Sequence, residues 1–401
     1  MSYKKCKRLW APFLLGILSP LQFLRIYGVN FTLFDLACLI CLLFYILVRG
    51  KYPTISTGYL VASFSMSFAV VMSSIGSINV TGALGQASQW MFIFFVVIPI
   101  LFKICKNFKS KITLLLGILV GVSIVITMSV DLWVQGKVTG PAGRFGGPYK
   151  NPQMLGFQVA CTLPISIFVA MYYRENIQKA ASRWLVSGFA YVVLFGSLSL
   201  LYISGSRSSA SAAAISLSLF LILAKTKSIS HTKIILTFLA NVITLCLLLW
   251  ISSLVVDVTV LIDRFKTLSI YTGETVKRIR SITSAIDNIS IYHMFFGTGL
   301  DNSQYYTEFY VNPHNTLVLL FIESGLVAAI TFAFIIIHFY SRTVSRISYL
   351  PFNVTSYNIT VACVSSFTAF VIISMFNTQS IARIYWVFYS VGLASSLDTN
   401  V

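Results

Sequence analysis

Charged side chains are scarce in this sequence. Only 10% of its 401 residues are Asp, Glu, Lys or Arg, whereas 57% are hydrophobic. A soluble domain of this length needs a polar shell, because surface-to-volume scaling leaves much of the chain facing water. The shortage of charge excludes one or several soluble domains and predicts a single membrane domain over residues 1–401.

Acidic residues are the scarcer kind, with 11 Asp and Glu against 29 Lys and Arg and a net charge of +18. Such an excess would suit a nucleic-acid-binding protein only if it formed a contiguous basic face on a soluble domain. Here the basic residues lie in short loops between apolar runs. We therefore expect no nucleic acid partner and attribute the charge to membrane topology.

Neither the cysteines nor the N-terminal segment predicts a functional site or a cleavage site. Most of the seven cysteines lie singly inside apolar runs, and the C-x-x-C spacing of Cys38 and Cys41 has no histidine or second pair nearby. We expect no disulfide framework, no metal site and no cofactor. Residues 4–8 are basic and residues 9–24 apolar, but no small-residue cleavage site follows, so we interpret them as a retained first helix and not a signal peptide.

Long apolar runs dominate what is present. Their lengths of roughly 18 to 25 residues suit a crossing of ~30 Å of hydrocarbon. The predicted fold class is all-α, a polytopic membrane helical bundle with about twelve transmembrane helices. The runs lie near residues 9–24, 31–48, 54–74, 88–102, 112–130, 154–173, 184–203, 209–224, 234–256, 315–339, 357–376 and 380–397.

Basic residues are unequally divided between the two sides of this predicted bundle. Eighteen of the 29 lie in the N-terminal segment and in every second connection, where Glu175 is the one acid. The positive-inside rule makes that side cytoplasmic, and both termini are expected there. The other side has a shorter loop, residues 131–153, and a large loop, residues 257–313. From Glu274 the large loop shows the spacing of an amphipathic helix, suited to the bilayer surface or to a cap on the bundle.

Arg207 lies among serines, in residues 204–209, where an apolar helix is expected to begin. The free N–H groups of a helix N-terminus, two neighbouring hydroxyls and a guanidinium together suit a phosphate. The alternative is an arginine that only extends its side chain to the membrane interface. We favour the phosphate site.

His314 precedes a long apolar run. Asn312 suits the N-cap and Pro313 the first helical position. This places the imidazole in the first helical turn, where the helix dipole would hold it neutral and available as a general base. Gly325, eleven residues later, would share its helical face at ~100° per residue. The alternative is an interfacial histidine bonded to a loop carbonyl.

Further polar residues on the same non-cytoplasmic face are candidates for binding an anionic diphosphate. The glycines of residues 143–152 and 297–299 either let backbone N–H groups approach an anion or only turn the chain; the first segment is no P-loop, because no strand precedes it. Glu323, inside a span, is expected to pair with a cation or face a polar cavity. The candidates are Arg144, Lys150, Asn151, Arg264, Arg278, Arg280, Asn315, Glu323 and Arg383.

These motifs resemble the O-antigen ligase and polymerase family, bacterial membrane enzymes that ligate or polymerise lipid-linked polysaccharide. The likeness spans residues 140–330, and the expected helix count agrees with it. It rests on four features: His314-Asn315 with Gly325 after nine intervening residues, Ser206-Arg207 opening a helix of small residues, the loop at residues 143–152, and Arg280 ahead of residues 297–299.

The resemblance implies a metal-independent, inverting glycosyltransferase of the bacterial inner membrane, acting on its periplasmic face. The donor would be an undecaprenyl-diphosphate-linked glycan, and the acceptor lipid A–core or a second glycan-lipid, with membrane lipids around the bundle. Arg207 and Arg280 would bind the diphosphate leaving group, while His314 would activate the acceptor hydroxyl. Ala328 and Ser211 depart from the ligase pattern, so ligation and polymerisation both stay open.

Two other classes of function are considered. A transporter or flippase of a lipid-linked or anionic solute should carry carboxylates at mid-membrane if it is proton-coupled. The only acids expected inside spans, Asp35 and Glu323, lie toward one end instead. A non-catalytic scaffold would have no use for the pairing of His314 with Arg207.

Overall fold

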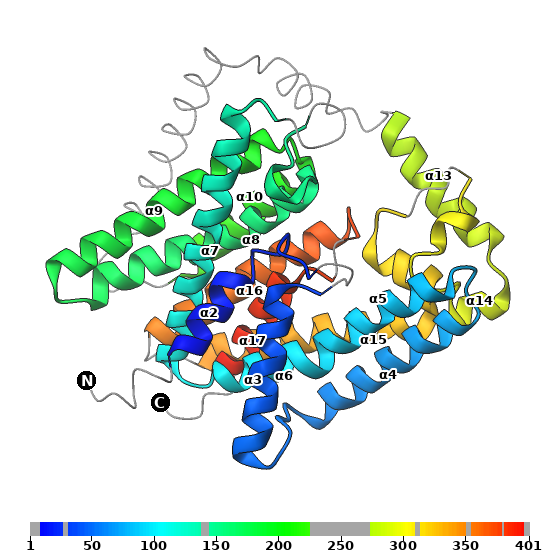
Figure 1. Ribbon diagram of the computed structural model, residues 1–401, viewed down its shortest axis with the longest axis horizontal. Coiled ribbons are helices and arrows are strands. Elements are labelled where there is room, and N and C mark those ends of the chain that lie inside the picture. The colour runs from blue at the N-terminus through cyan, green and yellow to red at the C-terminus, as the bar shows by residue number, and fades with distance from the viewer. Residues whose placement is uncertain are drawn as a thin grey trace.

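The structure of this chain, a computed structural model, describes residues 9–26, 31–137, 144–224, 273–308, 313–349, 354–378 and 381–396 (Figure 1). Within these residues the only extended pairing is one bridge between Arg25 and Thr32. The all-α class is therefore confirmed for the described part of the chain. Its helices are α2 (Trp10–Leu18), α3 (Leu33–Arg49), α4 (Thr57–Ile75), α5 (Val80–Phe92), α6 (Ile98–Ile104), α7 (Phe108–Val134), α8 (Pro152–Asn176), α9 (Ala180–Ile203), α10 (Arg207–Leu223), α13 (Gly273–Asn288), α14 (Ile291–Phe296), α15 (Thr316–Tyr349), α16 (Val354–Ser374) and α17 (Arg383–Ser396), with a π-helical turn η1 (Ile93–Val97) and 3-10 turns η3 (Gly147–Tyr149) and η4 (Ser303–Tyr306).

Eleven of the twelve predicted apolar runs coincide with helices of the described residues. The run near residues 234–256 lies outside them. Seven of the described helical segments are long and apolar enough to cross a membrane. The protein is thus a multi-pass membrane protein, although α2, α3, α10 and α17 are shorter than these seven. The amphipathic helix expected from Glu274 is present as α13.

Glycines set the direction of α2 against α7. Gly16 of α2 meets the backbone of Gly117, and a methyl group added to Gly117 would lie 2.3 Å from the carbonyl oxygen of Phe13. One turn further along both helices, Gly121 approaches the carbonyl oxygen of Ile17 equally closely. Only small residues allow two helices to come this near. Because later residues of α2 contact later residues of α7, the two helices are parallel and begin at the same end of the bundle.

Two hydrogen bonds show which other helix ends lie close together. The hydroxyl of Tyr357, near the start of α16, donates to the Leu223 carbonyl at the end of α10, at 2.9 Å. The Nζ of Lys111, near the start of α7, donates to the Ala394 carbonyl near the end of α17, at 3.4 Å. These contacts lie at one end of the bundle. The opposite end, at which α3, α8, α10, α15 and α17 begin, is called here the site end.

A π-helical turn connects α5 to α6, and Pro99 accounts for it. Proline lacks an N–H and its ring collides with the carbonyl four residues earlier, so the helix must widen there. The carbonyls freed by this widening are taken up by two tyrosines. Tyr59 donates to Phe94 at 2.6 Å, and Tyr52 donates to Phe95. The widened helix is thereby held to α4 and to the segment before it.

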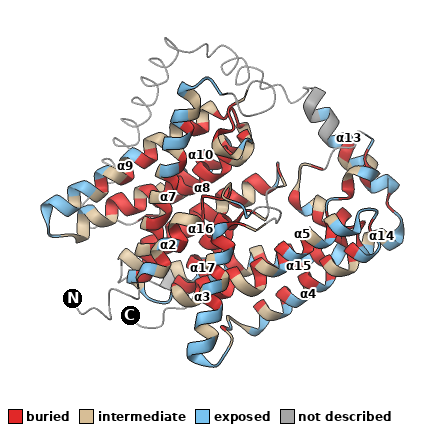
Figure 2. Ribbon diagram, viewed as in Figure 1, coloured by how far each residue is buried: buried red, intermediate tan, exposed pale blue. Residues whose placement is uncertain are grey.

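The core surrounds α17, in which every residue from Arg383 to Ser395 is buried (Figure 2). Trp386 lies at its centre, in edge contact with Trp90, Phe94 and Phe332. Such edge-to-face pairs add about 0.5–1.5 kcal/mol each to the burial of the rings. Around this core, α3, α4 and α9 expose apolar side chains, such as the 83% exposed Leu47. Exposed apolar residues on peripheral helices are what a bundle surrounded by lipid requires.

Candidate functional site

A buried ion pair joins the starts of α3 and α17. Arg383 donates from Nε to Oδ1 of Asp35 at 2.9 Å and from Nη2 to Oδ2 at 3.1 Å. Its Nη1 donates to the Ile381 carbonyl at 2.6 Å and to Oε1 of Gln89 at 3.4 Å. Asp35 is 0% exposed and Arg383 3%. Arg383, predicted to bind substrate, therefore has its charge matched by a carboxylate of the protein.

Asp35 also caps its own helix. The Thr32 hydroxyl accepts from the Asp35 N–H, while Oδ2 of Asp35 accepts from the Thr32 N–H at 2.9 Å. This capping box supplies partners for two backbone donors that a helix start leaves unsatisfied. The cap holds the carboxylate in the orientation in which it meets Arg383, and these added hydrogen bonds lower the free-energy cost of burying the pair.

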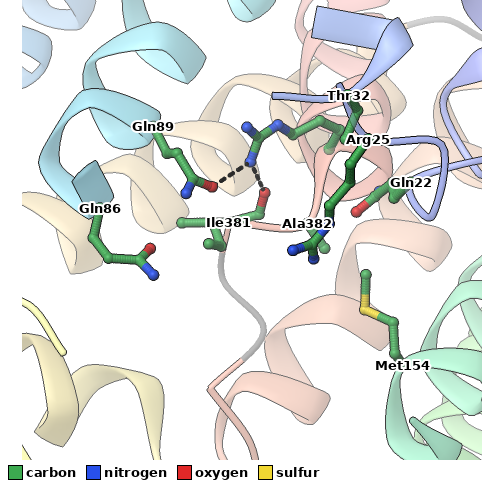
Figure 3. A pocket seen from close by; sticks show the side chains of 9 residues that line it. Gln22, Arg25, Thr32, Gln86, Gln89, Met154, Ile381 and Ala382 are labelled. Atoms are coloured by element: carbon green, nitrogen blue, oxygen red, sulfur yellow. Dashed lines mark hydrogen bonds between the residues drawn. The ribbon is translucent and has the colours of Figure 1, made fainter. Parts of the chain in front are cut away.

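The ion pair borders a cavity of about 120 Å³ at the site end. Figure 3 shows its lining side chains, which come from α5, α8, α17 and the segments before α3 and α17. Three of them are glutamines. The lining residues are Gln22, Arg25, Thr32, Gln86, Gln89, Met154, Ile381, Ala382 and Arg383.

Arg207 is the first residue of α10, so the helix start expected there is confirmed. Gly205 reverses the chain before it with a φ of 58°. The hydroxyls of Ser206 and Ser209 hydrogen-bond to each other at 2.6 Å. Gly156 of α8 packs against Ser209, since a methyl group at Gly156 would lie 2.7 Å from its hydroxyl. Arg207 is half-buried at the site end.

The loop before α8 is a tight turn. Gly147 has a φ of 54°, and a methyl group on Gly146 would lie 2.5 Å from the backbone nitrogen of Asn151. Asn151 caps α8 through its side-chain oxygen, which accepts from two backbone N–H groups at 2.9 and 3.3 Å. These glycines therefore turn the chain tightly, and binding of an anion by their backbone N–H groups stays a prediction. Lys150 is exposed at the end of the turn.

Two side chains tie this loop to the bundle. Arg144 donates from Nε to the Ser204 carbonyl at 3.2 Å, which places the loop beside the start of α10. Tyr149 donates to the carbonyl of Pro20. Burial raises the pKa of the Tyr149 phenol, because it disfavours the charged form. The hydroxyl therefore stays a neutral hydrogen-bond donor.

His314 lies just before α15 and not in its first turn. The cap is Asn315, whose Oδ1 accepts from the N–H groups of Leu317 and Val318 at 3.0 and 3.1 Å. The expectation of an Asn312 cap with Pro313 as first helical residue was therefore wrong, because Asn315 offers the same capping group three residues later. His314 is half-buried in a bend at the site end.

Arg207 and His314 are both placed beside the end of α16. The Nδ2 of Asn315 donates to the Met375 carbonyl at 3.2 Å, so the residue after His314 contacts the segment that follows α16. On the other side, α10 packs antiparallel to α16, with the end of α10 against the start of α16. The start of α10, with Arg207, therefore lies beside the end of α16. The two residues share one end of the bundle.

Helix α15 is broken at Gly325, which has a φ of 78° and a ψ of 179°. The break frees the carbonyls of Ile322 and Glu323, which accept from the N–H groups of Thr298 and Gly299, both at 2.9 Å. The argument that Gly325 returns to the helical face of His314 was therefore wrong, since no continuous helix connects them. Residues 297–299 form a turn packed on the break, not a cradle of free N–H groups.

Glu323 has its partner at the start of η4, shortly after this turn. Its Oε1 accepts from the Ser303 hydroxyl at 2.8 Å and from the Ser303 N–H at 3.4 Å. The residue before η4 contacts the start of α5, because the Asn79 N–H donates to the side-chain oxygen of Asn302 at 2.9 Å. The carboxylate is 3% exposed. It holds a loop in place instead of pairing with a cation, and its proposed contact with substrate stays a prediction.

The remaining candidates lie on α13 or outside the described residues. Arg280 is exposed on α13, a helix that packs against α15 and η4 at the site end. Arg278 belongs to the same helix, but its side chain is outside the described residues, as is all of Arg264. Among the described residues, no group of three His, Cys, Asp or Glu side chains is arranged to hold a metal ion.

Comparison with known families identifies the segment that carries these residues. Residues 190–333 match the family model of the O-antigen ligases. The family resemblance seen in the sequence is thus confirmed over about a third of the chain. This O-antigen ligase segment begins within α9, ends within α15 and contains Arg207, Arg280 and His314. A comparison with curated proteins found no match.

Sequence reasoning missed the polar cavity, which lies outside the O-antigen ligase segment. Gln86 and Gln89 were overlooked because they are uncharged and start an apolar run. Two glutamines one helical turn apart share a face, and this spacing was the signal that could have found them. The pairing of Asp35 with Arg383 left no local signal, because their positions differ by 348 residues.

Proposed function

We propose that this protein transfers a glycan from undecaprenyl diphosphate to an acceptor hydroxyl at the periplasmic face of the bacterial inner membrane. The acceptor is lipid A–core for a ligase or a second glycan-lipid for a polymerase. The observation that carries the proposal is the O-antigen ligase match, which contains Arg207 and His314. Their common position beside the end of α16 supports it.

The reaction needs three events. The oxygen of the acceptor hydroxyl attacks the anomeric carbon, the bond from that carbon to the diphosphate oxygen breaks, and the hydroxyl proton is removed. The imidazole of His314 takes the proton as general base. The bonding electron pair leaves with the diphosphate, whose growing charge is stabilised by the guanidiniums of Arg207 and Arg280. Attack opposite the leaving group inverts the anomeric configuration.

Guanidinium groups can replace a metal here because a diphosphate is already a stable anion. Arg207 is suited to this role by its place at the first position of α10, where the helix dipole also favours negative charge. Arg144, Lys150, Arg264 and Arg278 are proposed to add positive charge along the glycan path. Asn151 and Asn315 cap α8 and α15, so we propose that they position the neighbouring site residues.

The proposal is tested with purified full-length protein in lipid nanodiscs, supplied with polyprenyl-diphosphate glycan and each acceptor in turn. We expect His314→Ala and Arg207→Ala to abolish transfer while thermal unfolding stays unchanged. The matched controls are His293→Ala, a half-buried histidine of α14, and Arg49→Ala, an exposed arginine at the opposite end. Normal product from both site variants would refute the proposal.

A transporter or flippase of lipid-linked glycan is the alternative. It predicts that protein in liposomes moves the donor between leaflets without an acceptor and without forming a new glycosidic bond. The enzyme predicts a new linkage, whose anomeric configuration also reports inversion.

A further inference from the structure

The cavity beside the Asp35–Arg383 pair has a lining unlike that of a diphosphate site. Its most buried cation, Arg383, is already bound by the carboxylate of Asp35. The remaining cation among the lining residues, Arg25, is exposed and has no ion pair among the described residues. A diphosphate carries several charges and would need more than one uncompensated guanidinium. Charge alone therefore argues against an anion as the ligand of this cavity.

The glutamines offer both donors and acceptors to the cavity. Gln22 uses its Nε2 on the Ser19 carbonyl at 3.2 Å, which leaves its Oε1 as an acceptor. Gln89 uses its Oε1 on Arg383, which leaves its Nε2 as a donor. Gln86 makes no side-chain hydrogen bond within the part of the chain that the structure describes, and Figure 3 shows its amide facing the same space as Gln89 and Arg25. A mixture of donors and acceptors suits hydroxyl groups, which both donate and accept.

Apolar side chains complete the lining. Met154 and Ile381 border the cavity together with the glutamines. A sugar ring presents C–H groups on its faces and hydroxyls on its rim, so it matches a space with amides on some sides and aliphatic groups on others. The volume of about 120 Å³ is well below the ~300–1,000 Å³ of pockets that enclose drug-sized ligands. The space suits one ring of a longer glycan.

We propose that this cavity binds one sugar unit of the glycan substrate and thereby selects which glycan reacts. The inference rests on the proposed function and adds a recognition site to it. Met154 follows the Asn151 cap in the first turn of α8, and Ile381 lies six residues after the Met375 that contacts Asn315. The cavity therefore opens at the same end of the bundle as Arg207 and His314. A glycan reacting there has a neighbouring ring or chain end within reach of the glutamines.

Gln86→Leu is the main test, because Gln86 is half-buried and its loss removes no hydrogen bond of the described protein. Its matched control is Gln153→Leu, a half-buried glutamine at the same end that does not line the cavity. We expect Gln86→Leu to raise the KM of one substrate about three- to tenfold and to leave kcat little changed, because the variant loses one or two hydrogen bonds to the sugar. The double variant Gln86→Leu/Gln89→Leu should raise this KM further. If the KM of the donor rises, the donor glycan occupies the cavity; if the KM of the acceptor rises, the acceptor does.

Binding is measured separately from transfer. The probe is the oligosaccharide released by mild acid from the producing cell's own polyprenyl-diphosphate glycan, observed by saturation-transfer NMR on the full-length protein. We expect a signal for the wild type and for Gln153→Leu, and a weaker one for Gln86→Leu. Inorganic pyrophosphate should leave the signal unchanged. Displacement of the Gln86-dependent signal by pyrophosphate would overturn the sugar assignment in favour of an anion.

The outcomes separate this inference from the proposed function. Transfer by the wild type with no effect of Gln86→Leu on either KM or NMR signal overturns the cavity proposal and leaves the transferase standing. Gln86-dependent binding of the oligosaccharide without any transfer supports the cavity and overturns the transferase. Absence of both binding and transfer overturns both.

Discussion

Arg383 and Asp35 form a two-point ion pair that fixes the start of α17 against the start of α3. Neither side chain is exposed enough for water to replace its partner. Isolated charges in such a site would be costly, but this pair has bidentate geometry and further hydrogen bonds from Thr32 and to Gln89. The pair therefore determines one wall of the glutamine-lined cavity.

Asp35→Asn should destabilise the protein strongly. It leaves a buried guanidinium without a counter-charge, and breaking one partner of such a pair typically costs about 3–5 kcal/mol. The double variant Asp35→Leu/Arg383→Met should recover much of this loss, because it removes both charges and keeps apolar volume. Thermal unfolding of the purified protein in detergent measures both. A double variant as unstable as Asp35→Asn would show that the ion pair is not the cause.

Gly325→Ala should destabilise the break in α15. An alanine at a φ of 78° is strained, which costs of order 1–3 kcal/mol, and its methyl group would lie 2.1 Å from the Phe295 carbonyl oxygen. We expect a lower unfolding temperature and lower glycan transfer, since the break seats the turn of residues 297–299. The control is Gly188→Ala, in an exposed position of α9 with no atom nearby. Alanine there should be neutral or stabilising by about 0.5–1 kcal/mol. Equal effects of the two changes would contradict the proposed strain.

Substitutions of Glu323 should separate a structural from a substrate-binding role. Glu323→Gln keeps an oxygen that accepts from Ser303, so we expect a small change in stability. Glu323→Leu removes the hydrogen bond that the buried Ser303 hydroxyl donates to the carboxylate, so we expect a larger loss, of about 1–3 kcal/mol. Unfolding temperature and KM are measured together for both variants. A Glu323→Gln variant with normal stability and a strongly raised KM would assign the carboxylate to substrate binding.

Transfer should not require a metal ion or a nucleotide. In the proposed reaction Arg207 and Arg280 stabilise the diphosphate, and His314 takes the proton, so chelation should leave the rate unchanged. The measurement is initial transfer rate before and after dialysis against EDTA, with no ATP present. Loss of activity on dialysis, with recovery on adding Mg²⁺ or Mn²⁺, would contradict the proposed role of the arginines.

Much of the fold could be predicted because membrane helices are encoded locally. Each needs a run of apolar residues long enough for the bilayer and must satisfy its own backbone hydrogen bonds, so position in the sequence suffices. The start of α10 at Arg207 and the amphipathic helix α13 were also predicted, because both follow from neighbouring residues in the sequence. The family was also readable, because its residues are close in sequence around His314 and Arg207.

Prediction was poorer where one local signal competed with another. Asn312 and Asn315 are equivalent as caps by residue type, and the contact of Asn315 with Met375 accompanies the cap that formed. Gly325 was interpreted as a packing residue of a straight helix. In the structure the helix breaks at Gly325, and the N–H groups of the turn at residues 297–299 donate to the carbonyls that the break leaves free. Helical spacing could not reveal this, since the partners come from a turn that precedes the helix in the chain.

The sequence by itself determined the class of protein, the approximate limits of the described helices and the residues with chemistry near the helix ends. Each of these follows from composition and from neighbours within a few turns. Only the tertiary structure decided that Asp35 neutralises Arg383, that Ser303 holds Glu323, and that three glutamines line one cavity. Charge pairing and cavity lining depend on distances in space: Ser303 and Glu323 are 20 positions apart and Asp35 and Arg383 are 348 apart, and each pair meets only once the bundle has packed.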